Sequence, residues 1–185
     1  MLSPTLTRFD HILLQCRKVF SDKMHDYGTS WRILRTPSLT DQIFIKAKRI
    51  RSIEEKGTSQ VSEGIAPEFI GMINYSLMAL IQLEMGANDV LEMDPSRVLE
   101  AYDKYTTTAR ELLSRKNHDY GEAWRDMRLG SFTDIILMKL LRIKQIEDKQ
   151  GVTLASEGID ANYYDIINYS VFALIMLEDT GSQGH

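Results

Sequence analysis

Apolar residues recur every three or four positions along most of the chain, which is the spacing of amphipathic helices. The clearest stripe lies near the start and consists of Phe9, Ile12, Leu13, Cys16, Val19 and Phe20. Apolar and polar residues do not alternate with a period of two over any long stretch, so nothing indicates strands. We therefore predict an all-α protein.

The pattern predicts six main helices, at about 5–25, 39–56, 67–85, 96–117, 133–149 and 161–179. The four prolines lie at or near the expected helix starts, and glycines follow the expected ends, which is the usual asymmetry of helix punctuation. Gly28 is expected to end the first helix, Ser38 or Thr40 to cap the second, and Asp94 to open the fourth.

The six helices form two copies of one plan. Residues 21–56 match 114–149 in 19 of 36 positions at a shift of 93, and 62–84 match 156–178 in 13 of 23 at a shift of 94. A period of about 93 residues is too long for the repeat unit of a solenoid. It indicates two small helical domains that cover each other's apolar faces. We predict a bundle of two tandem three-helix repeats, 1–86 and 87–185, packed as one globular unit with a pseudo-two-fold axis.

Composition narrows the classes of partner. The 185 residues are 43% apolar and carry a formal net charge of −4, so the chain can bury a core but has no basic field for polymeric nucleic acid or an anionic membrane. The apolar stretches 69–86 and 163–178 are interrupted by polar residues and are short for a bilayer, so buried helices are expected instead.

The single cysteine, Cys16, excludes an internal disulfide and a Cys-based zinc site. The start of the sequence lacks the basic and apolar regions of a secretory signal. Both features predict a reducing, cytoplasmic setting.

Two acids that recur in both copies are candidate metal ligands. Glu54 and Glu147 continue the apolar stripe of the second helix in each repeat. Burial of an unpaired carboxylate is costly, so each should meet a cation or hydrogen-bond donors. They either hold a metal ion at the mouth of the bundle, pair with a Lys or Arg of the other copy, or lie exposed at the helix end.

The same helices carry two cations one turn apart, Lys46 and Arg49 in the first repeat and Lys139 and Arg142 in the second. Retained cations beside a retained acid suit a phosphate chain, since Arg offers a bidentate fork and Lys a point charge. The alternative is a pair of ordinary salt bridges at the seam between the copies.

The third helix distinguishes the repeats. Asp165 and Asn168 lie one turn apart on one face, whereas the first copy has Gly71 and Asn74 at these positions. If metal binding needs this acid, the second repeat holds the intact site. The two asparagines could instead bond helix backbones inside the core.

Two short motifs complete the set of candidates. Ser-Glu-Gly-Ile places Glu63 and Glu157 either in an acidic cluster or at a helix start favoured by the helix dipole. Lys-x2-Asp-Tyr-Gly-x2-Trp spans 23–31 and 116–124. Its Asp could cap, pair with the Lys or bind metal, and its aromatic residues could stack a base or plug the core under a loop.

These motifs, together with Thr-Asp-x4-Lys-x2-Arg-Ile-x3-Glu, Glu-Gly-Ile and Ile-Asn-Tyr, carry a resemblance. The string resembles the bacterial and phage nucleotide modification associated domain, once per copy and over nearly the whole chain. That family implies a link to nucleotide metabolism and base modification. More remotely, the helical plan is similar to the MazG-like all-α nucleoside triphosphate pyrophosphohydrolases, which hold Mg²⁺ with Glu-x2-Glu and Glu-x2-Asp. Neither copy carries a strict Glu-x2-Glu.

Our leading hypothesis from these resemblances is a Mg²⁺-dependent pyrophosphohydrolase, with Mn²⁺ as an alternative ion, acting on a standard or modified nucleoside triphosphate. Its catalytic acids would be Glu147, Glu157 and Asp165. Metal ligands would be these three with Asp134, Asp41, Glu54 and Glu63. Substrate would bind to Lys116, Asp119, Tyr120, Trp124, Lys139, Arg142 and Asn168, and in the first repeat to Lys23, Asp26, Tyr27, Trp31, Lys46, Arg49 and Asn74.

Two alternatives stay open, a non-catalytic nucleotide-binding or phosphate-binding module and a purely structural helical pair. The oligomeric state is open as well. MazG-like proteins usually build their sites at dimer interfaces, so the resemblance implies that the fused repeat replaces one such dimer internally, and a homodimer of the whole chain stays open.

Overall fold

The computed structural model describes residues 3–57, 64–88, 93–151 and 158–182, and within these ranges it is all-helical. The helices in chain order are α1 (Pro4–Tyr27), η1 (Ser30–Ile33), α2 (Thr36–Lys56), α3 (Ala66–Met85), α4 (Pro95–Tyr120), η2 (Ala123–Asp126), α5 (Leu129–Asp148) and α6 (Ile159–Ser182). The six predicted helices are confirmed to within four residues at each end. The short 3₁₀ helices η1 and η2, which carry the two tryptophans, were not predicted.

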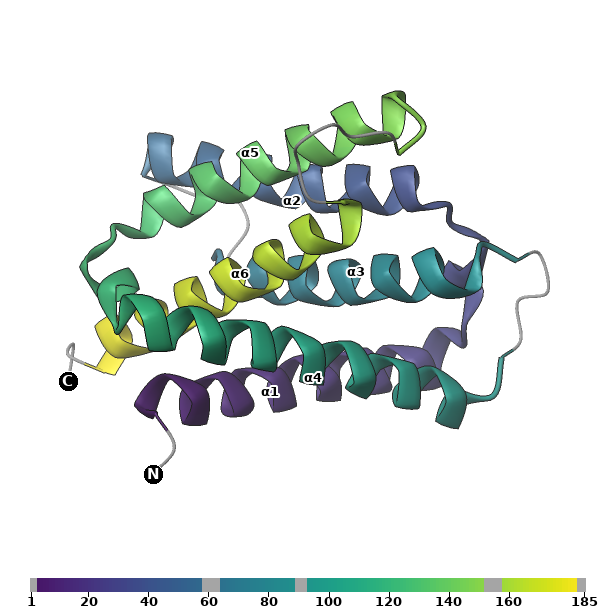
Figure 1. Ribbon diagram of the computed structural model, residues 1–185, viewed down its shortest axis with the longest axis horizontal. Coiled ribbons are helices and arrows are strands. Elements are labelled where there is room, and N and C mark those ends of the chain that lie inside the picture. Colours follow the sequence, from purple (N-terminus) through teal and green to yellow (C-terminus); the bar gives the residue numbers. More distant parts are fainter. Residues whose placement is uncertain (1–2, 58–63, 89–92, 152–157, 183–185) are drawn as a thin grey trace.

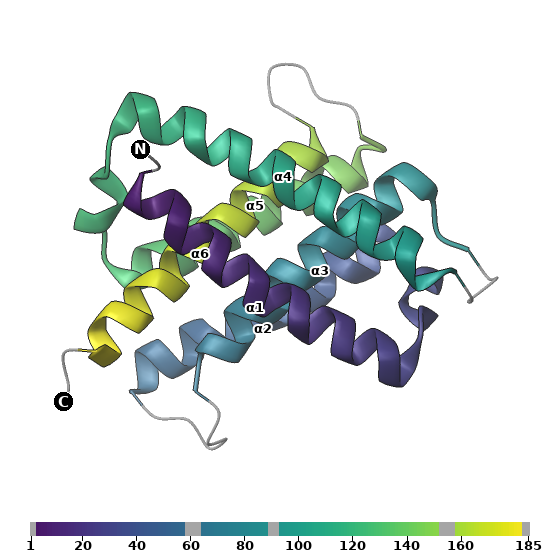
Figure 2. The same ribbon diagram turned by 90° about the horizontal axis from the view of Figure 1, so that it is seen from below.

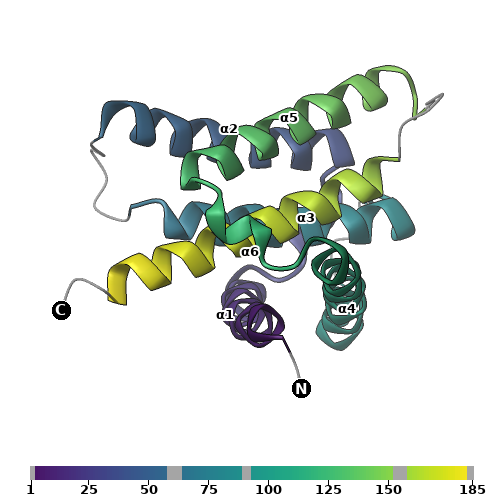
Figure 3. The same cartoon turned by 60° about the vertical axis from the view of Figure 1, so that its left-hand side comes forward.

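The six long helices form three layers, each made of the equivalent helices of the two repeats (Figure 1). Helices α3 and α6 form the middle layer, with α2 and α5 on one side and α1 and α4 on the other (Figure 3). Seen from below, α1 and α4 lie across the middle layer (Figure 2). The middle layer is covered on both faces, which explains why α3 and α6 are the most apolar helices of the chain.

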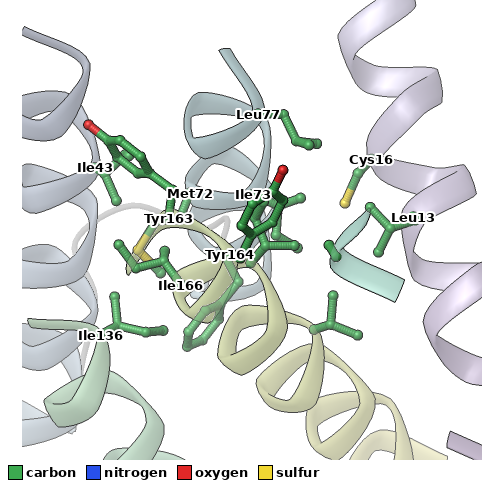
Figure 4. Close-up of a cluster of buried hydrophobic side chains, with 14 of the residues drawn as sticks. Leu13, Cys16, Ile43, Met72, Ile73, Leu77, Ile136, Tyr163, Tyr164 and Ile166 are labelled. Carbon is green, nitrogen blue, oxygen red and sulfur yellow. The ribbon is translucent and has the colours of Figure 1, made fainter. Parts of the chain in front are cut away.

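The core runs through all three layers. Leu13 of α1, Ile43 of α2 and Ile136 of α5 are buried against the side chains of α3 and α6, among them Ile73 and Tyr163 (Figure 4). No described helix is both long and apolar enough to cross a bilayer.

The pseudo-two-fold relation is visible in pairs of reciprocal contacts. The Arg17 guanidinium donates to Asp103 at 2.7 Å between α1 and α4, and Arg110 donates to Asp10 at 2.7 Å in the opposite direction. The partners in the two pairs are related by the same shift of 93 residues as the sequence repeat. The repeats therefore face each other through one surface used twice, as in a two-fold dimer.

Two predicted helix boundaries are confirmed. Gly28 ends α1 with φ +63°, and its N–H donates to the Met24 carbonyl at 2.8 Å. Asp94 caps α4, where its side chain accepts from the Ser96 N–H at 3.0 Å.

The predicted cap of the second helix was wrong. Helix α2 begins at Thr36, and its N-cap residue Arg35 makes no side-chain cap bond. Pro37 lies in the first turn, where its fixed φ suits a helix start and its missing N–H costs nothing. Ser38 and Thr40 are therefore inside the helix, and Thr40 is free for a contact described below.

Candidate ligand-binding site

A pocket of about 880 Å³ opens in the first repeat, between α1, η1, α2 and α3. Five of the residues predicted to bind substrate line it: Lys23, Tyr27, Trp31, Lys46 and Asn74. The fold thus brings the Lys-x2-Asp-Tyr-Gly-x2-Trp motif at the end of α1 together with a cation of α2 and an amide of α3.

One wall of the pocket is aromatic and apolar. Gly28 turns the chain out of α1 with a positive φ that glycine adopts readily, and η1 then places Trp31 beside α1. The Trp31 ring meets Phe20 of α1 edge-on, with centroids 6.2 Å apart. Met78 of α3 also lines the pocket. Such a surface suits a planar ring, because stacking and apolar burial both favour it.

Positive charge lies beside this wall. Lys46 contacts the Glu68 carboxylate at 3.3 Å, and Arg49 donates to the same carboxylate at 2.8 Å. Lys23 is exposed at the pocket and has no hydrogen bond or ion pair to any described residue. Two lysines therefore reach the pocket, and within the described ranges only one of them has an acid.

The corresponding positions of the second repeat form a closed ion cluster. Lys116 and Lys139 are the counterparts of Lys23 and Lys46. Lys116 donates to one oxygen of Asp165 at 2.7 Å, and Lys139 lies 2.8 Å from the other. Burial disfavours the charged form of Asp165, but the two ammonium groups outweigh it and hold its pKa below the ordinary value.

The second tryptophan is packed against a phenylalanine and an arginine. Phe172 stacks on Trp124 with ring centroids 4.4 Å apart and planes 8° from parallel. The Arg125 guanidinium lies 4.5 Å from the centroid of the Trp124 ring. Trp124 is only 7% exposed, so here the plug interpretation is confirmed. The counterpart of Phe172 in the first repeat is Met78, and there the space beside the tryptophan belongs to the pocket.

The two repeats carry the acid of the third helix at positions that differ by one helical turn. The first repeat has Glu68 and Gly71 where the second has Asn162 and Asp165. In the first repeat the acid holds the two cations of α2, and in the second it joins the cations of α4 and α5. The described pocket of about 880 Å³ lies in the first repeat, which has Gly71 at the position of Asp165. The expectation that Asp165 marks the intact site stays a prediction, and the pocket itself lies in the other repeat.

Glu54 and Glu147, the predicted ligands on α2 and α5, lie at the seam between these helices. The Thr133 hydroxyl donates to Glu54 at 2.8 Å, and the Thr40 hydroxyl donates to Glu147 at 2.8 Å. Burial raises the pKa of both carboxyl groups above the ordinary value. The hydrogen-bond donors expected beside these acids are thus present, and they come from the other repeat.

The remaining acidic candidates on the seam have basic partners. Asp41 lies 2.9 Å from Lys144, and Asp134 lies 3.9 Å from Arg51, so each pair again joins the two repeats. In the described part of the chain, no three His, Cys, Asp or Glu side chains gather closely enough to hold a metal ion. Glu63 and Glu157 lie outside the described residues, and the Mg²⁺ or Mn²⁺ site stays a prediction.

The two asparagines bond helix backbones, as one interpretation expected. Asn74 donates to the Cys16 carbonyl at 3.1 Å and accepts from the Tyr102 hydroxyl at 2.8 Å. Asn168 donates to the Ala109 carbonyl at 3.4 Å. Asn74 still lines the pocket, whereas Asn168 serves the core of the second repeat.

The other predicted residues lie on the surface. Asp26 and Asp119 are exposed beside the histidines that precede them, Tyr120 is 77% exposed, and Arg142 is exposed on α5. Sequence reasoning missed Glu68, Met78 and Phe172 because, apart from Asp165 and its counterpart Gly71, it considered residues kept in both copies. The signal that could have found them is the set of third-helix positions where the copies differ.

Comparison with known families now places the chain. A family model described as nucleotide modification associated domain 1 matches residues 23–83 and again 116–177. The matches cover more than half of the chain, one in each repeat, and the protein belongs to this family. Neither a curated protein nor a solved structure matches the chain. The remote similarity to MazG-like enzymes stays a prediction.

Proposed function

We propose that the protein binds a nucleotide in the pocket of the first repeat. The observation that carries this is Lys23, a lysine with no acid among the described residues, beside an apolar wall that contains Trp31. The pocket volume, about 880 Å³, is within the range of roughly 300–1,000 Å³ typical of small-molecule sites. Membership of a nucleotide modification associated family fits the same ligand class.

Each part of the pocket has a role in this proposal. Lys23 and Lys46 attract the phosphate groups, since charge-assisted contacts to phosphate are stronger than neutral ones. Trp31 and Met78 receive the base on the apolar side. Glu68 holds Lys46 and Arg49 in place from the edge of the pocket.

Pyrophosphate release with Mg²⁺ or Mn²⁺ remains a further prediction for a bound triphosphate. Mg²⁺ commonly binds through one or two carboxylates together with substrate phosphates. Glu68 is the carboxylate on the described pocket wall, and both of its oxygens already face Lys46 and Arg49. This donor set does not fit a metal ion, because both oxygens are already taken by cations.

Thermal unfolding across nucleoside mono-, di- and triphosphates, each with and without Mg²⁺, tests the binding proposal. Ligand at about 100 times Kd should stabilise the fold by roughly 2.7 kcal/mol. Lys23→Ala and Trp31→Ala should reduce this shift. Lys18→Ala is the matched control, since it removes the same charge from an exposed site on the same helix. No shift with any nucleotide would contradict the proposal, and a pyrophosphate assay on the same samples tests hydrolysis.

A further inference from the structure

The second repeat contains, in its own side chains, the two chemical groups that a nucleotide would bring to the first. A carboxylate, that of Asp165, lies between Lys116 and Lys139 at 2.7 and 2.8 Å. An aromatic ring, that of Phe172, lies flat on Trp124 at 4.4 Å. Both residues belong to α6.

The first repeat lacks both groups, and the flexible end of the Lys46 side chain lies beside the position where the aspartate would be. Gly71 replaces the aspartate and Met78 replaces the phenylalanine, and both line the pocket together with the two lysines and the tryptophan. Lys23, Lys46 and Trp31, the three pocket residues equivalent to the partners of the carboxylate and the ring, are therefore retained, while the carboxylate and the ring are absent.

We propose that Asp165 and Phe172 are built-in substitutes for the ligand, and that the second repeat is a self-filled copy of the site in the first. The Asp165 carboxylate then marks where an anionic group of the ligand binds, between Lys23 and Lys46. The Phe172 ring marks where the ring of the ligand lies against Trp31. The protein should therefore bind one ligand per chain. That this ligand is a nucleotide rests on the proposed function.

The spacing of the substitutes describes the ligand. Asp165 and Phe172 are seven residues apart on one helix, which corresponds to about 10 Å along the axis at 1.5 Å per residue. The ligand should therefore carry its anionic group well away from its ring, as a nucleoside with a phosphate chain does. Inorganic pyrophosphate should fill the lysine part of the site alone, with lower affinity.

Exchange of residues between the repeats tests the proposal. The variant Asn162→Glu/Asp165→Gly/Phe172→Met gives the second repeat the residues that the first has at these three positions. The new glutamate can then hold Lys139 and Arg142 as Glu68 holds Lys46 and Arg49. Calorimetric titration with each common ribonucleoside triphosphate, and with pyrophosphate, should then give two sites per chain instead of one. Lysine acetylation read by mass spectrometry should show Lys116 and Lys139 newly protected by the bound probe.

The opposite exchange closes the first site. A Cβ at Gly71 would lie 2.8 Å from the Cε of Lys46, which is the mobile end of a lysine and can move aside. Gly71→Asp should therefore draw Lys46 and Lys23 onto the new carboxylate and weaken binding at least tenfold. Gly71→Ala adds the same Cβ without the charge and should weaken binding less.

The outcomes separate this inference from the proposed function. Two sites in the triple variant and loss of binding in Gly71→Asp support it. A folded triple variant that still binds one ligand, or Gly71→Asp with the affinity of the unmodified protein, overturns it and leaves the proposed function standing. An unmodified protein that binds no probe overturns the proposed function instead.

Discussion

The hydroxyl of Thr40 in the first repeat donates to the carboxylate of Glu147 in the second at 2.8 Å, and Thr133 and Glu54 make the same bond in reverse. The Tyr163 hydroxyl lies 2.6 Å from the Thr40 hydroxyl, so one of these bonds extends into the core. A half-buried acid on each side of the seam is thus held by a neutral donor from the other repeat.

Glu147→Gln should raise the melting temperature at pH 7 to 8. Burial raises the pKa of Glu147, so the folded state favours the neutral carboxyl and loses stability as pH rises from 4.5 through the raised value. Glutamine keeps an acceptor for Thr40 without the charge. The gain should disappear below pH 4.5, where Glu147 is neutral in both states.

Thermal unfolding as a function of pH checks this, with Glu111→Gln as a control for an exposed glutamate on α4. A lower melting temperature for Glu147→Gln at pH 8 would show that the seam depends on the negative charge.

Asp165→Asn should destabilise the protein at neutral pH by about 1–3 kcal/mol, because the amide has no negative charge and offers one acceptor oxygen where two ammonium groups each had their own. Lys116 and Lys139 hold the pKa of Asp165 below its ordinary 3.8 despite burial. The stabilisation is therefore complete above pH 3.8 and is lost as pH falls through the lower folded value.

Chemical denaturation at pH 7 measures this loss. Asp103→Asn is the comparison, since Asp103 pairs with Arg17 in a half-exposed position, where a salt bridge contributes about 0–1 kcal/mol. Equal losses for the two variants would contradict the special role of the Asp165 cluster.

Tyr102→Phe should cost about 0.5–1.5 kcal/mol of unfolding free energy, because the buried oxygen of Asn74 loses its donor. The second repeat already shows this state. Phe9 stands at the position of Tyr102, and the side-chain oxygen of Asn168 has no partner among the described residues. Phe9→Tyr should therefore be less costly than Tyr102→Phe, and the reverse order in urea denaturation would be a contradiction.

Cys16 should resist thiol reagents in the folded protein. It is fully buried, and burial raises the pKa of its thiol to about 12. Since the thiolate is the reactive form, a chromogenic disulfide at pH 8 should detect no thiol before unfolding and one after. Rapid reaction without denaturant would show that α1 opens locally.

The sequence predicted most of the fold, because helix periodicity and the internal repeat are local or pairwise signals. It placed α5 too late, at Thr133 instead of Leu129, since Gly130 lowers the helix propensity of the first turn. Burial of Glu54 and Glu147 followed from their place on an apolar stripe. Their threonine partners did not, because the register between α2 and α5 is set by tertiary packing.

The sequence predicted several residues of the candidate site, but it did not predict which of the two repeats contains the pocket. Lys23, Trp31 and Lys46 were recognised because both copies keep them. The difference that opens one site and fills the other lies in Gly71 and Asp165, and an isolated sequence does not reveal whether an added acid binds a ligand or a neighbouring lysine.

The reciprocal contacts of the two repeats have a consequence for how the site can vary. In a dimer of identical chains, a substitution enters both halves at once, so residue 71 and its counterpart could never differ. Joining the halves in one chain removes that restriction. Glycine on one side and aspartate on the other then give a single molecule one open and one occupied half, while the shared seam stays symmetric.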